Sequence, residues 1–125
     1  MDEKEVAAAV AEQAGLAKEE AADLVRATLE GLGNQLSGGA ARGLARDLPD
    51  GLARHLPPHD RGAHPVPVRD FARRLSQRTG LNAAEVTRGV QAILTILGRA
   101  PEGTDLRRAL SQLPAEYRRP TMTTG

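Results

Sequence analysis

Apolar residues recur along the chain with the 3.6-residue period of amphipathic helices, and this pattern predicts helices and no strand. Within Glu3–Ala14, Val6 and Val10 stand one helical turn apart, and Arg69–Thr79 repeats the pattern. Each segment is followed by a glycine, which readily adopts the left-handed conformation at which many helices end. We therefore predict a short helix over each of these two ranges.

Two longer helices follow, over Lys18–Gln35 and Ala83–Arg99. Their buried stripes are predicted to consist of Leu24, Val25, Thr28, Leu29, Leu32 and Leu36 in the first and Val86, Val90, Ile93, Leu94 and Leu97 in the second. Asn82 and Glu85 have the spacing of a capping box, in which each side chain satisfies an amide of the first helical turn. Ala17 has no side chain that can cap the earlier helix.

A third pair of helices is predicted over Gly39–Asp47 and Asp105–Gln112, with Ser37 and Thr104 as caps. A Leu-Pro pair then breaks each helix, and proline is tolerated in the first turn of a short fourth helix. Leu52 and Leu56 anchor the first of these short helices, and Tyr117 anchors the second. The predicted fold class is therefore all-α.

The chain also matches itself. Glu5–Ala53 aligns without a gap to the residues 65 positions further on, with about a dozen identities. Gly15 falls on Gly80, and the two Leu-Pro pairs coincide. We predict two similar copies, repeat 1 over about residues 3–56 and repeat 2 over about 68–119. Each has three helices and a short fourth one.

One such copy buries too little apolar surface to offset the entropy of ordering its chain. We therefore expect the two copies to share one core, related by approximate two-fold pseudo-symmetry, in a single helical domain over residues 1–120. Four prolines between residues 57 and 67 exclude helix there and predict a semi-rigid linker. Residues 121–125 are expected to be a disordered tail.

Composition narrows the class of protein. The 125 residues suit one domain, and Phe71 and Tyr117 are the only aromatic residues, so the core must consist of Leu, Val, Ile and Ala. The sequence has no cysteine, which excludes disulfides and thiolate metal sites. No apolar run is long enough to cross a membrane, and the acidic N-terminus is unlike a signal peptide. We expect a cytoplasmic protein without a membrane association.

These motifs resemble those of a bacterial family, domain of unknown function 2267. Leu36–Gly39 reads LSGG and Leu113–Tyr117 reads LPAEY, and both match the family's repeated pattern. The second copy departs from LSGG, since Ala100–Gly103 reads APEG. The resemblance covers nearly the whole chain and implies an all-helical fold. It brings no established activity and no catalytic residues.

Charge is divided unevenly between the halves. Residues 1–60 hold six Lys/Arg against eleven Asp/Glu, and residues 61–125 hold eleven Arg against five Asp/Glu, a net of −5 against +6. Solvated helix faces alone can explain this division of charge. It can also indicate a basic surface that binds an acidic partner, or head-to-tail self-association. The candidate binding surface consists of Arg69, Arg73, Arg74, Arg78, Arg107 and Arg108.

Other candidate sites are weaker. Ser37, Gly38 and Gly39 open a helix whose amides can bind an anion, although a plain capped turn explains them as well. His55, His59 and His64 have metal-like spacing, but prolines surround them and we expect a solvated linker without fixed geometry. No catalytic constellation is visible, and we expect neither enzyme activity nor a metal or other cofactor.

Three functions remain open on the sequence. The favoured one is a non-enzymatic helical module that binds a protein partner or a second copy of itself. The first alternative is a binder of nucleic acid or another anionic ligand through the arginines of the second half, although no aromatic side chains are available to stack on bases. The second alternative is a binder of a small apolar molecule between the repeats.

Overall fold

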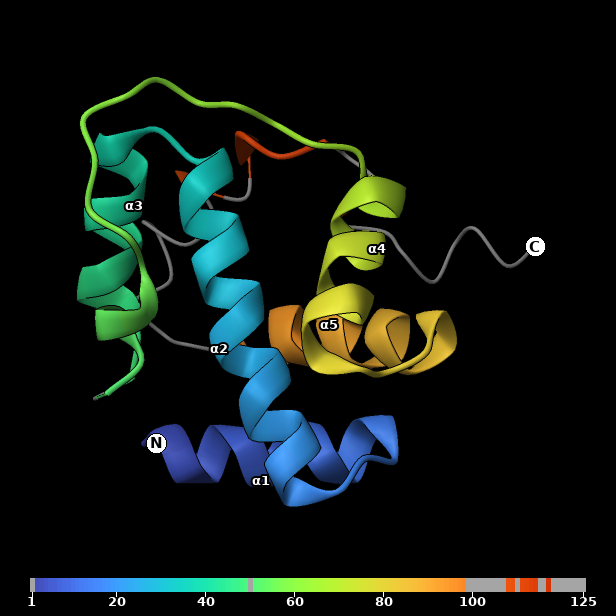
Figure 1. Cartoon of the computed structure of the whole chain (residues 1–125). Coiled ribbons are helices and arrows are strands. Elements are labelled where there is room, and N and C mark those ends of the chain that lie inside the picture. The colour runs from blue at the N-terminus through green and yellow to red at the C-terminus, as the bar shows by residue number, and fades with distance from the viewer. Residues whose placement is uncertain (1, 50, 99–107, 110, 115–116, 118–125) are drawn as a thin grey trace.

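A computed structural model describes residues 2–49, 51–98, 108–109, 111–114 and 117 of the chain. Within these residues the chain forms α-helices and one short 3-10 helix, and no strand (Figure 1). The helices are α1 (Glu3–Ala14), α2 (Lys18–Gln35), α3 (Gly38–Asp47), η1 (Ala53–His55), α4 (Val68–Thr79) and α5 (Ala83–Leu97). The all-helical fold class is therefore confirmed.

Local side-chain chemistry explains where these helices begin. At α5, Asn82 Oδ1 accepts a hydrogen bond from the Glu85 amide (2.8 Å), and Glu85 Oε1 accepts one from the Asn82 amide (2.9 Å). This is the predicted capping box. At α2, Glu20 Oε1 accepts from the Ala17 amide (2.9 Å), which is one half of a capping box, while Ala17 has no side chain to accept from the Glu20 amide. Gly15 and Gly80 end α1 and α4 with φ values of 69° and 81°.

Helix α2 lies at the centre of the molecule. It contacts α1, α4, α5 and η1, while α1 also packs along α5 (Figure 1). The first helix of each half of the chain thus packs against the second helix of the other half as well as its own. Each half contributes side chains to a shared interior, because neither half closes its apolar face alone.

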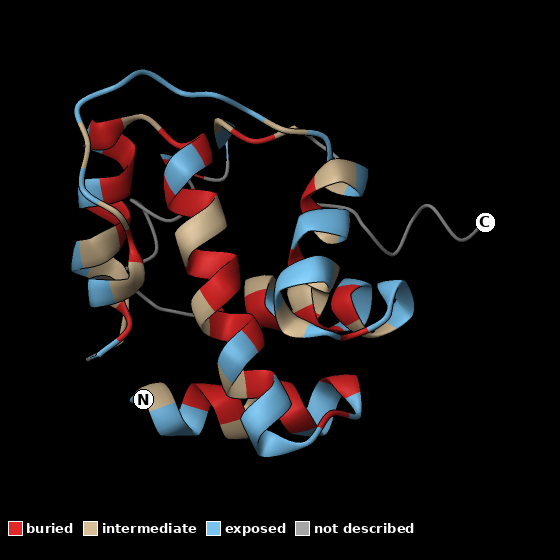
Figure 2. Cartoon of the chain, in the orientation of Figure 1, coloured by how far each residue is buried: buried red, intermediate tan, exposed pale blue. Residues whose placement is uncertain are grey.

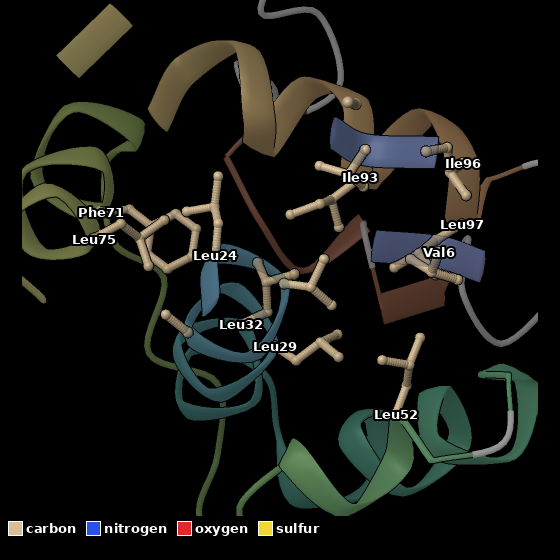
Figure 3. Packing of buried hydrophobic residues seen from close by; sticks show 14 of the residues in the cluster. Val6, Leu24, Leu29, Leu32, Leu52, Phe71, Leu75, Ile93, Ile96 and Leu97 are labelled. Carbon is tan, nitrogen blue, oxygen red and sulfur yellow. The ribbon is translucent and has the colours of Figure 1, made fainter. Parts of the chain in front are cut away.

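The core is one cluster of aliphatic side chains that also contains the two aromatic rings. Val6, Leu24, Leu29 and Ile93 are fully buried, and they come from both halves of the chain (Figures 2 and 3). The ring centroids of Phe71 and Tyr117 lie 5.7 Å apart. The expected core of Leu, Val, Ile and Ala is found among the described residues, but Phe71 and Tyr117 are buried in the same cluster.

Helices α2 and α5 approach closely where Leu24 faces Gly89. A Cβ atom added at Gly89 would lie 2.1 Å from Leu24 Cδ2, so glycine is required for this packing. The side chain of Leu24 fills the space that Gly89 leaves open. This contact sets how closely the two longest helices approach each other.

The structure differs from the sequence predictions in several places. The short fourth helix of repeat 1 is a 3-10 turn at Ala53–His55 that begins after Leu52 and not at Pro49. Helix α5 ends at Leu97. Residues 105–107 and 110 of the predicted helix Asp105–Gln112 lie outside the described residues, and Arg108, Ala109 and Ser111 are helical. Thr104 and the tail 121–125 also lie outside them.

Candidate functional site

A groove with a cavity volume of ≈ 580 Å³ lies between α2, α4, η1 and the linker. We call this hollow the α2–α4 groove. Its apolar lining comes from Ala27, Gly31, Leu56, Pro57, Pro58, Val66, Phe71 and Leu75, and its polar lining from Glu30, Asn34, Gln35, Arg54, His55, His64, Arg74 and Arg78. An apolar floor with a polar rim resembles the anatomy of a protein interface.

Three arginines line the groove, and they differ in their partners. Arg54 donates to Glu3 Oε1 (2.9 Å), and Arg78 forms an ion pair with Glu30 across the gap between α4 and α2. Among the described residues, Arg74 has neither a hydrogen bond nor an ion pair, and its side chain is exposed. Arg74 is therefore the guanidinium available for a ligand.

The predicted arginine surface divides in two. Only Arg74 and Arg78 line the groove, whereas Arg69 and Arg73 do not. Arg73 instead donates to Asp70 Oδ1 (3.0 Å) on its own helix. Residues four positions apart share a helix face, so the pair 74/78 and the pair 69/73 form separate stripes.

The remaining candidate arginines do not join this group. Arg108 is exposed in the C-terminal segment and does not line the groove, and Arg107 lies outside the described residues. Arg54 was missed by the sequence analysis. It reaches the groove because η1 packs beside α2, and no periodicity within the chain signals that proximity.

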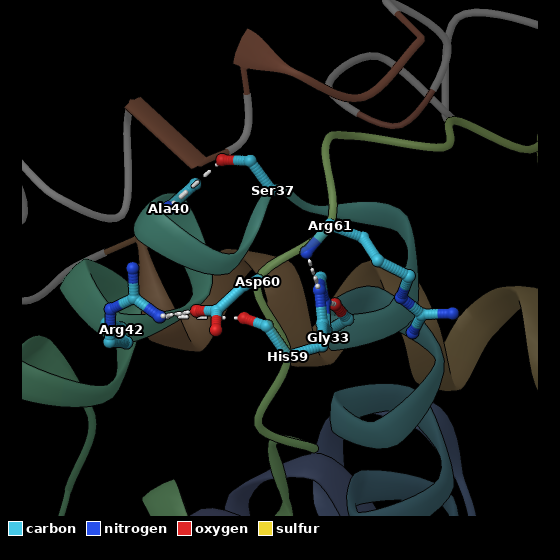
Figure 4. A network of polar contacts seen from close by, with 7 residues as sticks. All are labelled: Gly33, Ser37, Ala40, Arg42, His59, Asp60 and Arg61. Carbon is cyan, nitrogen blue, oxygen red and sulfur yellow. Dashed lines mark hydrogen bonds and ion pairs between the residues drawn. The ribbon is translucent and has the colours of Figure 1, made fainter.

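The linker is fixed to the corner between α2 and α3, which corrects the expectation that its histidines lack fixed geometry. His59 Nδ1 accepts from the Arg61 amide (3.2 Å), so Nε2 carries the proton and donates to the Gly33 carbonyl (2.9 Å) (Figure 4). Arg42 pairs with Asp60 at 3.1 Å. One neutral imidazole tautomer thus satisfies both contacts.

Gln35 connects the linker to the C-terminal segment at the end of the groove. Its side chain is only 2% exposed. Gln35 Oε1 accepts from the Val66 amide (2.8 Å), and Gln35 Nε2 donates to the Tyr117 hydroxyl (3.0 Å). The Tyr117 hydroxyl donates in turn to the Val66 carbonyl (2.5 Å). The sequence signal for Gln35 was its place seven residues after Thr28, on the buried stripe.

The turn of Ser37, Gly38 and Gly39 already donates to neighbouring groups. The Gly38 amide donates to the Arg61 carbonyl (3.0 Å), and the Ser37 amide donates to Gln112 Oε1 (2.9 Å). Ser37 Oγ accepts from the Ala40 amide (3.1 Å), as a helix cap does. Anion binding at this turn stays a prediction, and these amides serve the packing of the linker and the C-terminal segment.

The other histidines are held apart. His55 Nε2 lies 2.8 Å from Glu3 Oε2, and the His64 amide donates to the Gln35 carbonyl (2.7 Å). Among the described residues, no group of three or more His, Asp or Glu side chains is placed to hold a metal ion. The three histidines therefore form no common ligand set there.

A small apolar hollow lies between α4 and α5. Val68, Ala72, Val90, Leu94 and Tyr117 contribute to its lining, and its volume is ≈ 30 Å³. That volume accommodates about one water molecule. This hollow lies within repeat 2, so the small apolar ligand between the repeats stays a prediction. No described helix has both the length and the apolar character needed to span a membrane.

Comparison with known proteins returns one family. The family model described as "Uncharacterized conserved protein (DUF2267)" matches residues 3–119, which is nearly the whole chain. The search of curated proteins and the search of solved structures return no match.

Proposed function

The chain belongs to the DUF2267 family, and on that premise we propose that it is a non-enzymatic interaction module that binds a segment of another protein in the α2–α4 groove. The observation that carries this proposal is the groove itself, which combines the partly exposed apolar residues Pro57, Pro58 and Val66 with three arginines. Protein interfaces combine a buried apolar centre with a polar periphery.

The rigidity of the groove supports the same proposal. The Val66 amide donates to Gln35 Oε1 and Gln35 Nε2 donates to the Tyr117 hydroxyl, and these contacts hold the linker against α2 in the unbound chain. A pre-organised surface loses less conformational entropy on binding, which increases affinity for a given contact area. The alternative of nucleic-acid binding has less support, because Phe71 and Tyr117 are buried and unavailable for base stacking.

Site-specific photo-crosslinking tests the proposal. A photoreactive amino acid at Asn34 stands exposed in the groove, and the same group at Gln13 on α1 is the matched control. We expect one discrete protein adduct from Asn34 in cells and none from Gln13, and the identified partner should bind the purified chain in calorimetry. An adduct between two copies of this chain would replace the proposal with self-association. Equal adducts from both positions would contradict it.

We also propose that the two halves arose by duplication and pack about an approximate two-fold axis. The first helix of each half lies against the second helix of the other. Leu24 and Gly89 stand 65 residues apart, the offset of the sequence repeat, and they face each other. Residues at equivalent positions of two repeats can contact each other only where both lie next to the two-fold axis that relates the repeats.

Exchanging the two residues on this axis tests the duplication. Leu24→Gly removes a buried side chain and Gly89→Leu overfills the same contact, and each should lower the unfolding free energy by about 2–5 kcal/mol. The double variant places leucine on the other side of the axis and should recover at least half of the summed loss in urea titrations. Additive losses would contradict the axis.

A further inference from the structure

We infer that the segment bound in the α2–α4 groove is an acidic peptide, whose carboxylate is received by Arg74 while an adjacent apolar side chain contacts Pro58 and Val66 of the linker. This inference rests on the proposed function and names the chemistry of the partner.

The charge of the groove supports an acidic partner. Its lining holds three arginines (Arg54, Arg74 and Arg78) and one carboxylate, Glu30, which gives a net charge of +2 with neutral histidines. Glu3 lies outside the lining but pairs with Arg54 (2.9 Å), so Arg74 is the one lining arginine without a carboxylate partner among the described residues. Arg74 and Arg78 come from α4, and Arg54 comes from η1.

Arg74 is the arginine of the groove lining whose guanidinium is not already paired with a carboxylate of the described residues. Among the described residues it has no acidic partner, whereas Arg78 is engaged by Glu30. Arg74 stands on α4 between Phe71 and Leu75, whose buried side chains form part of the groove floor. A carboxylate bound to this guanidinium makes charge-assisted hydrogen bonds, and the nearby apolar surface limits screening by water.

The floor of the groove distinguishes a peptide from other anions. An anion such as inorganic phosphate satisfies the arginines but leaves the partly exposed apolar lining of Pro57, Pro58 and Val66 without a partner. Duplex DNA presents a rigid, regularly spaced phosphate backbone, and it requires cations along an extended surface. Here Arg69 and Arg73 are turned out of the groove and Arg73 is paired with Asp70. A peptide with acidic and apolar residues matches both parts of the lining.

A substitution at Glu30, which pairs with Arg78, tests the same chemistry with an expected effect of opposite sign. Glu30 is the one acidic side chain in the lining, and it both repels a ligand carboxylate and occupies Arg78. Glu30→Gln should therefore strengthen binding of an acidic peptide by about threefold. A variant that merely loosened the structure would weaken binding instead.

The experiment uses the full chain against an array of random nine-residue peptides, followed by fluorescence anisotropy. The labelled anisotropy probes are a peptide of glutamate and leucine, the same peptide with glutamine in place of glutamate, and a 20-base-pair DNA duplex. Unlabelled inorganic phosphate serves as the competitor. On the array, we expect the binding signal to rise with the number of acidic residues in a peptide. In anisotropy, the affinity for the acidic peptide should fall as the salt concentration rises. Arg74→Gln should weaken binding of the acidic peptide by about tenfold.

Arg69→Gln is the matched control, because Arg69 lies exposed on the same helix but outside the groove lining. It should change affinity by less than about twofold. Equal effects of the two substitutions, equal binding of the glutamine peptide, or tighter binding of the duplex would each overturn the inference. A lack of acidic preference on the array would overturn it as well.

Failure of this inference is separable from failure of the proposed function. A crosslinked partner that contacts Asn34 through a segment without acidic residues would overturn the acidic-peptide inference alone. Acidic peptides that bind through Arg74, in the absence of any crosslinked protein, would instead contradict the proposed interaction module.

Discussion

Two buried polar side chains on α2, Thr28 and Gln35, differ in how their polar atoms are satisfied. Gln35 makes hydrogen bonds to Val66 and Tyr117, so its burial is compensated. Thr28 is fully buried, and its hydroxyl has no hydrogen-bond partner among the described residues. A buried group without a partner loses its hydration and gains nothing in return. Gln35 therefore connects α2 to the linker and the C-terminal segment, whereas Thr28 lowers the stability of the core.

Thr28→Val should stabilise the protein. Valine has nearly the same shape and removes the unsatisfied hydroxyl, so we expect the unfolding free energy to rise by about 1 kcal/mol. Urea denaturation followed by circular dichroism measures the change. Thr87→Val on α5 is the control, because Thr87 is exposed, and it should leave the midpoint nearly unchanged. A loss of stability at position 28 would mean that the hydroxyl has a partner.

At the scale of elements, the linker acts as part of the folded structure and holds the end of α2. His59 contacts Gly33, and the Arg61 carbonyl accepts from the Gly38 amide (3.0 Å). A Cβ atom at Gly38 would lie 2.0 Å from the His59 carbonyl oxygen, so only glycine allows the linker to approach α3 this closely. Backbone atoms on both sides leave little room for adjustment.

Gly38→Ala should release the linker from the corner of α2 and α3. Alanine collides with the His59 backbone, so we expect trypsin to cleave after Arg61 at least about fivefold faster than in the wild type. Cleavage is followed by mass spectrometry under native conditions. Gly39→Ala is the control, because nothing lies within 4 Å of a Cβ atom there. Equal cleavage of the two variants would show that the contact does not hold the linker.

At the scale of the whole molecule, helices of each half pack against helices of the other half. The folding of each half therefore depends on the other. Helix α1 contacts α5, and α4 contacts α2, so cutting the chain in the linker leaves both halves with exposed apolar faces. Val6, Leu24 and Ile93 lie in the same cluster although they belong to different halves. Such faces are buried only when both halves are present.

Fragments 1–62 and 63–125 test this dependence. Each alone should lack a cooperative thermal transition, because about half of its buried apolar surface would face water. Mixed in equal amounts they should regain helicity and a cooperative transition in circular dichroism. If fragment 1–62 alone melted cooperatively near the temperature of the intact chain, the shared core would be contradicted.

The amino-acid sequence by itself determined the helices. The predicted limits of α1 and α2 agree with the structure, and those of α3 and α4 differ by one residue. Helix limits follow from caps, terminal glycines and apolar periodicity, which act within a few residues along the chain. The all-helical class and the aliphatic core follow from the same local signals.

Only the tertiary structure decided which residues form the candidate site. The sequence identified Arg74 and Arg78 but grouped them with Arg69 and Arg73, and it gave no signal for Arg54. Whether an arginine faces the groove depends on how α4 crosses α2 and on where η1 packs. The docking of the linker likewise depends on hydrogen bonds between distant residues, such as Gln35 with Val66. Those contacts depend on three-dimensional proximity, which no local pattern in the chain encodes.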